Sequence, residues 1–217
     1  MRVRINKVAL TIAVSTVIVV MLATGIAVAL AHGSTTSNPQ RDPLQAVRAA
    51  TARYHSLTVA QKNGYAILKD TAGIACIDNP GVGAMGVHYA NGDLVKAGRI
   101  VPDKPQALVY EPEANGQLRL VAVEYVVIKQ QWDATHQSAP MLFGQHFMLT
   151  PDGNRFGLPA FYSLHAWIWQ ANPTGMFSMW NPTVSCSAAT TGSPSNVVAP
   201  GPINAGDIPT AHPHTPR

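Results

Sequence analysis

The sequence predicts an α+β fold in which N-terminal helices pack on a curved antiparallel sheet or half-open barrel. Apolar residues recur at helical steps of three and four between residues 43 and 64. From residue 65 onward, short runs rich in β-branched and aromatic residues alternate with turn formers, which is the pattern of strands. Helices followed by a series of strands are typical of the α+β class.

The first helix is expected to begin at Asp42-Pro43, with Asp42 as N-cap and Pro43 at the first helical position. Its apolar residues follow at helical spacing: Leu44, Val47, Ala50 and Tyr54. A second, shorter helix is expected to begin at Thr58, where Gln61 would complete a capping box. Gly64 is expected to end it, since glycine is common just after a helix.

The strands are expected in five apolar runs: residues 85–90, 107–110, 118–128, 141–149 and 161–169. The last run is ambiguous between strand and helix, because its pattern suits either. Asn115-Gly116 separates the second run from the third and favours a tight turn, so these two runs are expected to pair as a hairpin. Pro151-Asp152-Gly153 marks a further turn after the fourth run.

Residues 1–31 have the composition of a signal peptide or of a transmembrane anchor. Three basic residues precede an uncharged, mostly apolar run over residues 8–31. This run is long for a signal peptide and long enough to span a bilayer, yet Ala29-Leu30-Ala31 suits signal-peptide cleavage. Both alternatives stay open. Both predict an exported protein, either secreted or anchored in the cytoplasmic membrane, with the membrane as its partner through residues 8–31 if they are not cleaved.

Composition divides the rest of the chain into a linker, one domain and a tail. Residues 32–42 are polar and rich in turn formers, as in a linker. Residues 43–186 are numerous enough for a single α+β domain with its own hydrophobic core. Residues 187–217 contain six prolines and few charges, so they are expected to form a disordered tail.

The charge balance argues against nucleic acid as a partner. The whole chain has a formal net charge of +4, with 15 basic and 11 acidic residues. Residues 1–31 hold three of the basic residues and none of the acidic ones, so the remainder has a net charge of +1. Without a run of Lys or Arg, the exported part lacks the basic surface that a polyanion requires.

The two cysteines, Cys76 and Cys186, are expected to form a disulfide. Both lie in the exported part, where a disulfide persists. The bridge would enclose most of the predicted domain, and constraining so long a loop in the unfolded chain stabilises the folded state. The alternative is a pair of buried free thiols.

Four ionisable residues in apolar, strand-like settings are candidate metal ligands: His88, Glu124, His146 and His165. Strict strand alternation would place Glu124 on an apolar face with five neighbours: Leu118, Leu120, Ala122, Val126 and Ile128. A carboxylate in such a setting requires a partner, a metal or a proton. Three histidines and a carboxylate suit a divalent metal such as Zn, Mn, Fe or Cu. A polar ligand pocket without metal, and purely structural hydrogen bonding, are the alternatives.

Aromatic residues near these positions are candidate ligand contacts. If residues 161–169 form a strand, His165 shares a face with Ser163, Trp167 and Trp169, as in the wall of a pocket. Tyr89, beside the first histidine of the set, is grouped with Trp167 and Trp169 as a ligand-binding residue for a small molecule. Filling the core is the alternative role for these rings.

Nine segments carry a family resemblance: ATARYH (50–55), NGY (63–65), MGVHY (85–89), LVYEP (108–112), LVAVEY (120–125), FGQHF (143–147), FYSLHAWIW (161–169), NPTGMF (172–177) and WNPTVSC (180–186). By these strings the chain resembles a family of uncharacterised exported bacterial proteins, with no established activity. The resemblance covers most of the predicted domain. It implies one exported domain and no particular catalytic residue.

The function expected from the sequence is an exported domain that binds a small molecule or a metal in a pocket of histidine, glutamate and aromatic side chains. One alternative is a metal-dependent or acid–base enzyme that uses the same residues. The sequence has neither a Gly-x-Ser-x-Gly nucleophile motif nor a glycine-rich phosphate loop, which argues against hydrolase and nucleotide chemistry of those types. The other alternative is a structural or interaction protein of the cell envelope.

Overall fold

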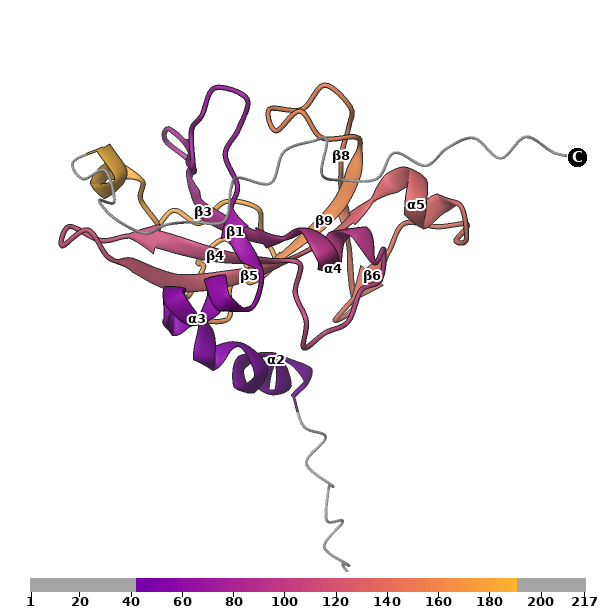
Figure 1. Ribbon diagram of the computed structural model, residues 1–217, viewed down its shortest axis with the longest axis horizontal. Coiled ribbons are helices and arrows are strands. Elements are labelled where there is room, and N and C mark those ends of the chain that lie inside the picture. Colours follow the sequence, from indigo (N-terminus) through magenta and orange to yellow (C-terminus); the bar gives the residue numbers. More distant parts are fainter. Residues whose placement is uncertain (1–41, 191–217) are drawn as a thin grey trace, which may run out of the picture. The chain divides into compact units, whose positions relative to one another are not determined.

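The computed structural model describes residues 42–190 of the 217-residue chain (Figure 1). The predicted export segment (1–31) lies outside the described residues. So do the predicted linker (32–42), except for its last residue, and the predicted tail (187–217) beyond Thr190. Within the described part, no helix combines the length and the apolar character needed to cross a membrane.

The chain begins with α2 (Pro43–Thr51), the 3₁₀ turn η1 (Ala52–His55) and α3 (Leu57–Lys62). The predicted start of α2 is confirmed, since Asp42 is the N-cap and its Oδ1 accepts a hydrogen bond from Leu44 N at 3.0 Å. The predicted start of α3 at Thr58 is wrong. Ser56 is the N-cap in an extended conformation, so α3 begins one residue earlier, without a side-chain capping bond.

A seven-stranded antiparallel sheet follows the helices. Its strands are β1 (Tyr65–Ile67), β2 (Cys76–Asn79), β3 (Gly83–Asn91), β4 (Ala107–Pro112), β5 (Leu118–Ile128), β8 (Met148–Thr150) and β9 (Phe161–Ala166). The strand order is β1-β3-β4-β5-β9-β8, and β2 also pairs with β3. The sheet is open and every pairing is antiparallel, so the expected α+β class is confirmed.

The remaining elements are short: α4 (Gly92–Lys96), α5 (Lys129–Asp133), β6 (Met141–Leu142), β7 (Gln145–His146) and η2 (Ser187–Thr190). The single strand expected over residues 141–149 is therefore wrong. Phe143 and Gly144 both have positive φ angles, which turns the chain back between β6 and β7. The ambiguous run from residue 161 is a strand as far as Ala166.

The β4–β5 hairpin predicted from Asn115-Gly116 is confirmed, but its register contains a β-bulge. Val109 pairs with Ala122, whereas the next residue of β4 pairs with Leu120, so Val121 is the extra residue of β5. The bulge shifts the alternation of side chains along β5. Leu118 and Leu120 therefore lie on the opposite face from Glu124, which corrects the single face expected from strict alternation.

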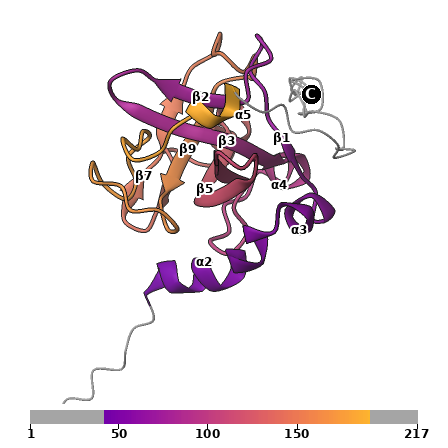
Figure 2. The same cartoon turned by 90° about the vertical axis from the view of Figure 1, so that its left-hand side faces the viewer.

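The helices cover one face of the sheet, here called the helix face (Figures 1 and 2). Its main cluster joins the helices to the strands: Val47, Tyr54, Ala60, Tyr89, Leu108, Tyr110, Val123, Tyr125 and Leu164 are all buried there. The Tyr110 hydroxyl donates a hydrogen bond to the Tyr54 carbonyl at 2.7 Å, which fixes η1 against β4. Burying these rings provides most of the apolar area on this face.

The opposite face of the sheet, here called the cavity face, is covered by loops and by the short helix α4. In Figure 1 the segment between β1 and β2 and the segment between β8 and β9 both rise from the sheet on the side away from the helices. A small cluster of Val95, Ile128, Leu158 and Phe161 closes one part of this face. A cavity lies between these covering elements and the strands.

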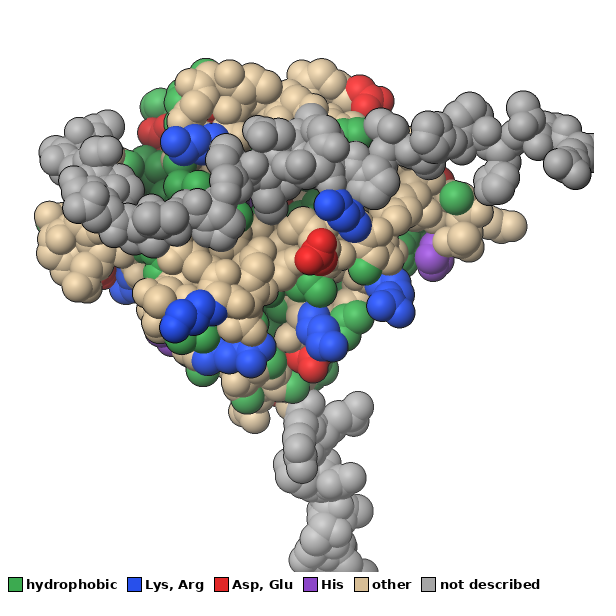
Figure 3. Space-filling model, in the orientation of Figure 1, with side chains coloured by type: hydrophobic (Ala, Val, Ile, Leu, Met, Phe, Trp, Pro, Cys, Tyr) green, Lys and Arg blue, Asp and Glu red, His purple; other side chains and the backbone are tan. Residues whose placement is uncertain are grey.

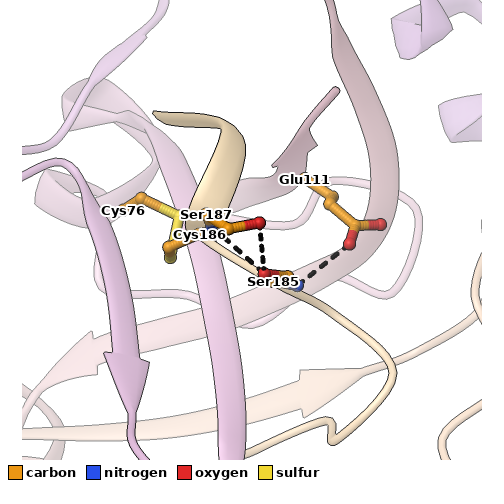
Figure 4. The surroundings of a disulfide bond; sticks show 5 residues. All are labelled: Cys76, Glu111, Ser185, Cys186 and Ser187. Atoms are coloured by element: carbon orange, nitrogen blue, oxygen red, sulfur yellow. Dashed lines mark hydrogen bonds between the residues drawn. A yellow bond between two sulfur atoms is a disulfide. The ribbon is translucent and has the colours of Figure 1, made fainter. Parts of the chain in front are cut away.

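The predicted disulfide between Cys76 and Cys186 is present, with a sequence separation of 110 residues. It joins β2 to the segment that follows residue 180 (Figure 4). Ser185 N donates a hydrogen bond to Glu111 Oε1 at 2.9 Å, and Glu111 also pairs with Arg119. The end of the domain is therefore held both covalently and through β4 and β5.

Charge is balanced over the described residues, which contain ten basic and ten acidic side chains between positions 42 and 190. Figure 3 shows one face, on which basic and acidic side chains lie among one another. Without a net charge the domain has no long-range field that would steer a polyanion to it. The exclusion of nucleic acid as a partner stays a prediction.

Gly83→Ala should destabilise the domain by about 2–4 kcal/mol, because the added Cβ meets rigid backbone. Gly83 has φ 138°, and a Cβ built there lies 2.4 Å from the Asn181 carbonyl oxygen. That carbonyl accepts the hydrogen bond from Ala84 N that joins β3 to the C-terminal segment. Urea unfolding of both proteins measures the difference.

Gly116→Ala is the matched control. Gly116 also has a positive φ, 79°, but a Cβ there has nothing within 4 Å. Only backbone strain of about 1–2 kcal/mol is expected. Equal losses for the two variants would show that the contact with Asn181 does not limit this position.

Candidate metal centre

Three of the four ionisable residues predicted as ligands meet on the cavity face. Glu124 on β5 lies directly opposite His165 on β9 in the strand register. His88 lies on β3, and β4 separates that strand from β5. Because neighbouring strands are about 4.8 Å apart, the His88 and Glu124 side chains have to reach across β4 to meet. Ala107 of β4 pairs with both Glu124 and Ala90, and its methyl group leaves room for that contact.

The three side chains place their nitrogen and oxygen atoms close together. His88 Nε2 lies 3.3 Å from His165 Nε2 and 3.4 Å from Glu124 Oε2. His165 Nδ1 lies 3.6 Å from Glu124 Oε1. One potential ligand atom from each residue falls within 4.8 Å of the other two, and all three residues are buried.

Burial keeps both histidines neutral. Each imidazole is 3% exposed. Desolvation lowers the pKa of His88 to about 4, because the neighbouring Glu124 carboxylate only partly offsets the loss of water. Desolvation also lowers the pKa of His165 to about 4. Both rings are therefore in the neutral form, which a metal requires, across the physiological pH range.

Burial acts on Glu124 in the opposite direction. Loss of water raises the pKa of its carboxyl, while His88 and a hydrogen bond with Ser163 lower it and offset part of the effect. A buried carboxylate without a full positive partner is costly to ionise. A divalent cation between the three side chains would remove that cost, because it supplies the missing charge.

The three residues line a cavity with a volume of about 300 Å³. The rest of its wall is mainly apolar, with Leu68, Met85, Val95, Val126, Phe156 and Leu158 among the lining residues. Polar side chains other than the three are few: Gln106, Thr150, Asn154, Arg155 and Ser163. The cavity wall is therefore mainly apolar with a small number of polar groups, as in many small-molecule sites.

An ion pair ties together the two loops that cover the cavity. Arg155 donates to Asp70 Oδ2 from its Nη2 at 2.7 Å and from its Nε at 3.2 Å. Asp70 Oδ1 accepts hydrogen bonds from two backbone N–H groups of its own loop, and Arg155 lowers the pKa of the Asp70 carboxyl. Thr71 N donates to the Arg155 carbonyl at 2.9 Å. Both loops are thus fixed over the sheet.

His146 is not part of the cluster. It lies exposed on β7, which pairs only with β6 in a separate two-stranded sheet. The local string FGQHF places a turn at Gly144, so His146 does not continue a strand of the main sheet. Neighbouring apolar residues in the sequence made His146 look equivalent to the other histidines, although it is not buried.

The three aromatic residues predicted to contact a ligand lie outside the lining of this cavity. Trp167 lies behind His165 with its ring nearly parallel to the imidazole, and its Nε1 donates to the Ser178 carbonyl. Trp169 Nε1 donates to the Thr51 hydroxyl near the helices. Tyr89 belongs to the core of the helix face. Trp167 and Tyr89 are buried and contribute packing, and Tyr89 also lines a second, larger pocket together with Ile67, Val87 and Leu118. The ligand-binding role of the three rings stays a prediction.

Sequence reasoning missed most of the cavity wall. Asn154, Arg155 and Phe156 come from the loop before β9, and Gln106 comes from the residue before β4. The Pro151-Asp152-Gly153 turn marks the loop, but no periodicity shows which face of the sheet it covers. Gln106 had one usable signal, since a polar residue beside an apolar strand requires internal hydrogen-bond partners.

Comparison of the chain with protein-family models, with curated proteins and with solved structures gave no match. The resemblance to exported bacterial proteins therefore stays a prediction, and the geometry of the cluster is the basis for any functional conclusion.

Proposed function

We propose that this is an exported domain that binds a divalent transition metal through His88, Glu124 and His165. Zinc is the metal we propose first. The observation that carries the proposal is the convergence of three buried ligand atoms within 4.8 Å from three different strands. Two neutral imidazoles and one carboxylate are a common ligand set of zinc sites that keep an open position. Export is supported by the pattern of residues 1–31 and by the disulfide, which persists outside reducing compartments.

Two of the three distances between the candidate ligand atoms are close to those of tetrahedral coordination. Zinc bonds of about 2.0–2.1 Å at tetrahedral angles place neighbouring ligand atoms about 3.3–3.4 Å apart. The two distances from His88 Nε2 are 3.3 Å and 3.4 Å. Octahedral sites with similar bond lengths would bring neighbouring ligands to about 3.0 Å. Zinc is placed first because two imidazoles and one carboxylate are an ordinary zinc ligand set.

The contacts of Glu124 with the two histidines are longer than those of a charged ion pair, as expected for neutral imidazoles. A charge-assisted hydrogen bond between nitrogen and a carboxylate is usually about 2.7–2.9 Å long. The contacts of Glu124 with His88 and His165 are 3.4 Å and 3.6 Å. His88 and His165 share a hydrogen bond of 3.3 Å between their Nε2 atoms, and Ser163 donates to Glu124, so the metal-free cluster is also held by hydrogen bonds.

One histidine lacks the outer support that zinc ligands usually have. Among the described residues, His88 Nδ1 is a buried nitrogen without a hydrogen-bond partner. When Nε2 binds a metal, Nδ1 carries the proton and would donate to a partner in most sites. We therefore expect a zinc affinity about 10- to 100-fold weaker than that of a site with full outer support.

Zinc titration of the purified, chelator-treated protein tests the proposal. One zinc ion per chain is expected, and His88→Ala or His165→Ala should each weaken binding by more than about 100-fold, because each removes a direct ligand. His146→Ala is the matched control, since His146 is exposed and outside the cluster, and it should leave the stoichiometry and affinity unchanged. Isothermal titration calorimetry measures both quantities.

Two outcomes would contradict the proposal. If wild-type protein binds no zinc, manganese, iron or copper ion, the cluster is not a metal centre. If all three histidine variants lose affinity equally, binding is not at the cluster. If another divalent metal binds at one ion per chain and more tightly than zinc, the metal site is retained and that metal, not zinc, is its occupant.

An acid–base enzyme is the second candidate, and the opposed pKa shifts at the cluster favour it. Glu124 has a raised pKa and the adjacent histidines have lowered ones, so a proton can be held at the carboxyl and accepted by an imidazole. This candidate uses the metal-free cluster. This candidate predicts turnover in the chelator-treated protein that is lost in Glu124→Gln, and turnover that requires added zinc would contradict it.

A further inference from the structure

We infer that the cavity beside the metal centre binds a small amphipathic monoanion, with its anionic head at the metal and an apolar body in the cavity. The inference rests on the proposed metal site. It adds the class of ligand, which the cluster alone does not specify. The hydrogen bonding of the wall, the charge of the centre and the cavity volume each support it.

Three polar side chains of the cavity wall away from the cluster, those of Gln106, Asn154 and Arg155, already have partners in the protein. Gln106 Nε2 donates to the Arg99 carbonyl at 2.8 Å, and Gln106 Oε1 accepts from Val126 N at 3.1 Å. Arg155 is paired with Asp70.

The side-chain amide of Asn154 is also engaged in hydrogen bonds within the protein. Its amide nitrogen donates to the Pro151 and Leu158 carbonyls at 2.9 Å and 2.8 Å, and its Oδ1 accepts from Phe156 N at 3.2 Å. These groups shape the wall but are committed to the protein. Apart from the Thr150 hydroxyl, a ligand therefore finds its polar partner at the metal, and a single polar head suits the site.

The net charge of the occupied metal centre favours a ligand with an anionic head group. A divalent cation with one ionised carboxylate and two neutral imidazoles has a net charge of +1. The histidines are 3% exposed and Glu124 is 8% exposed, so water screens this charge poorly. A buried unpaired charge is costly, and a monoanion such as a carboxylate would neutralise it. Carboxylate oxygen is also an ordinary ligand of zinc.

The volume of the cavity limits the size of the apolar part of the ligand. An apolar cavity of about 150 Å³ accepts benzene. The volume of about 300 Å³ therefore suits a ligand of about twice that size, on the order of twelve non-hydrogen atoms. Medium-chain carboxylates and aromatic carboxylates are in this range, whereas long-chain fatty acids exceed it.

Calorimetric titration with sodium octanoate tests the inference. The zinc-loaded protein should bind octanoate, and the chelator-treated protein should bind it at least about tenfold more weakly. Octan-1-ol, with the same chain and no charge, should bind at least about tenfold more weakly than octanoate to the zinc form. Hexadecanoate, which is too long for the cavity, should show no binding at the same site.

A substitution in the cavity wall tests ligand binding in the cavity independently of zinc binding. Val126 lines the cavity and is not a candidate ligand, so Val126→Phe should fill space while leaving zinc stoichiometry at one per chain. Octanoate affinity should fall at least about tenfold. If this variant fails to fold, Leu158→Phe, at the loop side of the same cavity, serves the same purpose.

Failure of the inference is distinguishable from failure of the metal site. Zinc binding is measured first, and if zinc does not bind, the proposed function itself is contradicted. If zinc binds but octanoate does not, or if octanoate binds equally with and without zinc, the ligand inference is overturned while the metal site stands. Equal affinity for octanoate and octan-1-ol would overturn the anionic head, and unchanged octanoate binding to the Val126→Phe variant would overturn the cavity as its site.

Discussion

Replacing both Cys76 and Cys186 with alanine should lower the free energy of unfolding by about 2–5 kcal/mol. The bridge spans a sequence separation of 110 residues. On the chain-entropy model a loop of this length stabilises the folded state by about 4–5 kcal/mol, since it restricts the unfolded ensemble. The alanines also remove two sulfur atoms from a partly buried contact between β2 and the C-terminal segment, which adds to the loss.

Urea unfolding of the oxidised wild type, the reduced wild type and the double alanine variant measures this effect. The reduced wild type is the control, because it keeps both side chains and loses only the covalent bond. The reduced protein should have nearly the midpoint of the double variant. A loss below about 1 kcal/mol in both would show that the other contacts of residues 181–186 suffice to hold this segment.

The metal-free domain should lose several kcal/mol of stability as the pH falls from about 6.5 to about 4. The folded-state pKa of both His88 and His165 is about 4, below the 6.5 of an exposed histidine. Between these values the unfolded state binds more protons than the folded state. The stability is therefore fully present above pH 6.5 and is lost as the pH falls through this window. Each histidine contributes on the order of 3 kcal/mol.

Glu124 acts against this trend. Its folded-state pKa is raised above 4.5, so protonation of its carboxyl favours the folded state as the pH falls. Two histidines oppose one carboxyl, and the net change is still a loss of stability in acid. Zinc should enlarge the difference, because protons displace a bound metal and remove its contribution.

Urea unfolding at several pH values in the presence of a chelator measures the net effect. The double variant His88→Gln/His165→Gln should show a much smaller loss between pH 6.5 and pH 4, since glutamine does not titrate. His146→Gln is the matched control for an exposed histidine and should retain the wild-type pH dependence. An unchanged pH dependence in the double variant would mean that the buried pair does not govern acid stability.

Local signals in the sequence predicted those features that depend on a few adjacent residues. Asp42-Pro43 places the start of α2, because the cap and the fixed φ of proline act within one turn. Asn115-Gly116 places the β4–β5 hairpin for the same kind of reason. The disulfide followed from two cysteines in a segment that the sequence predicts to be exported.

Features that depend on a partner strand escaped sequence reasoning. The bulge at Val121 exists only in the pairing with Val109, so alternation read from one strand put Leu118 and Glu124 on the same face. His146 resembles the other histidines in its sequence neighbours, but the turn at Gly144 takes it out of the main sheet. Neither outcome can be read from one segment by itself.

The sequence by itself determined the α+β class, the order of its helices and the β4–β5 hairpin, because propensity, caps and turns act over a few residues. It also named His88, Glu124 and His165 as unusual side chains in apolar strands. Only the tertiary structure decided that these three meet across β4 beside an apolar cavity, and that His146 does not join them. Their meeting depends on strand order, register and the small side chain of Ala107, which are properties of long-range pairing.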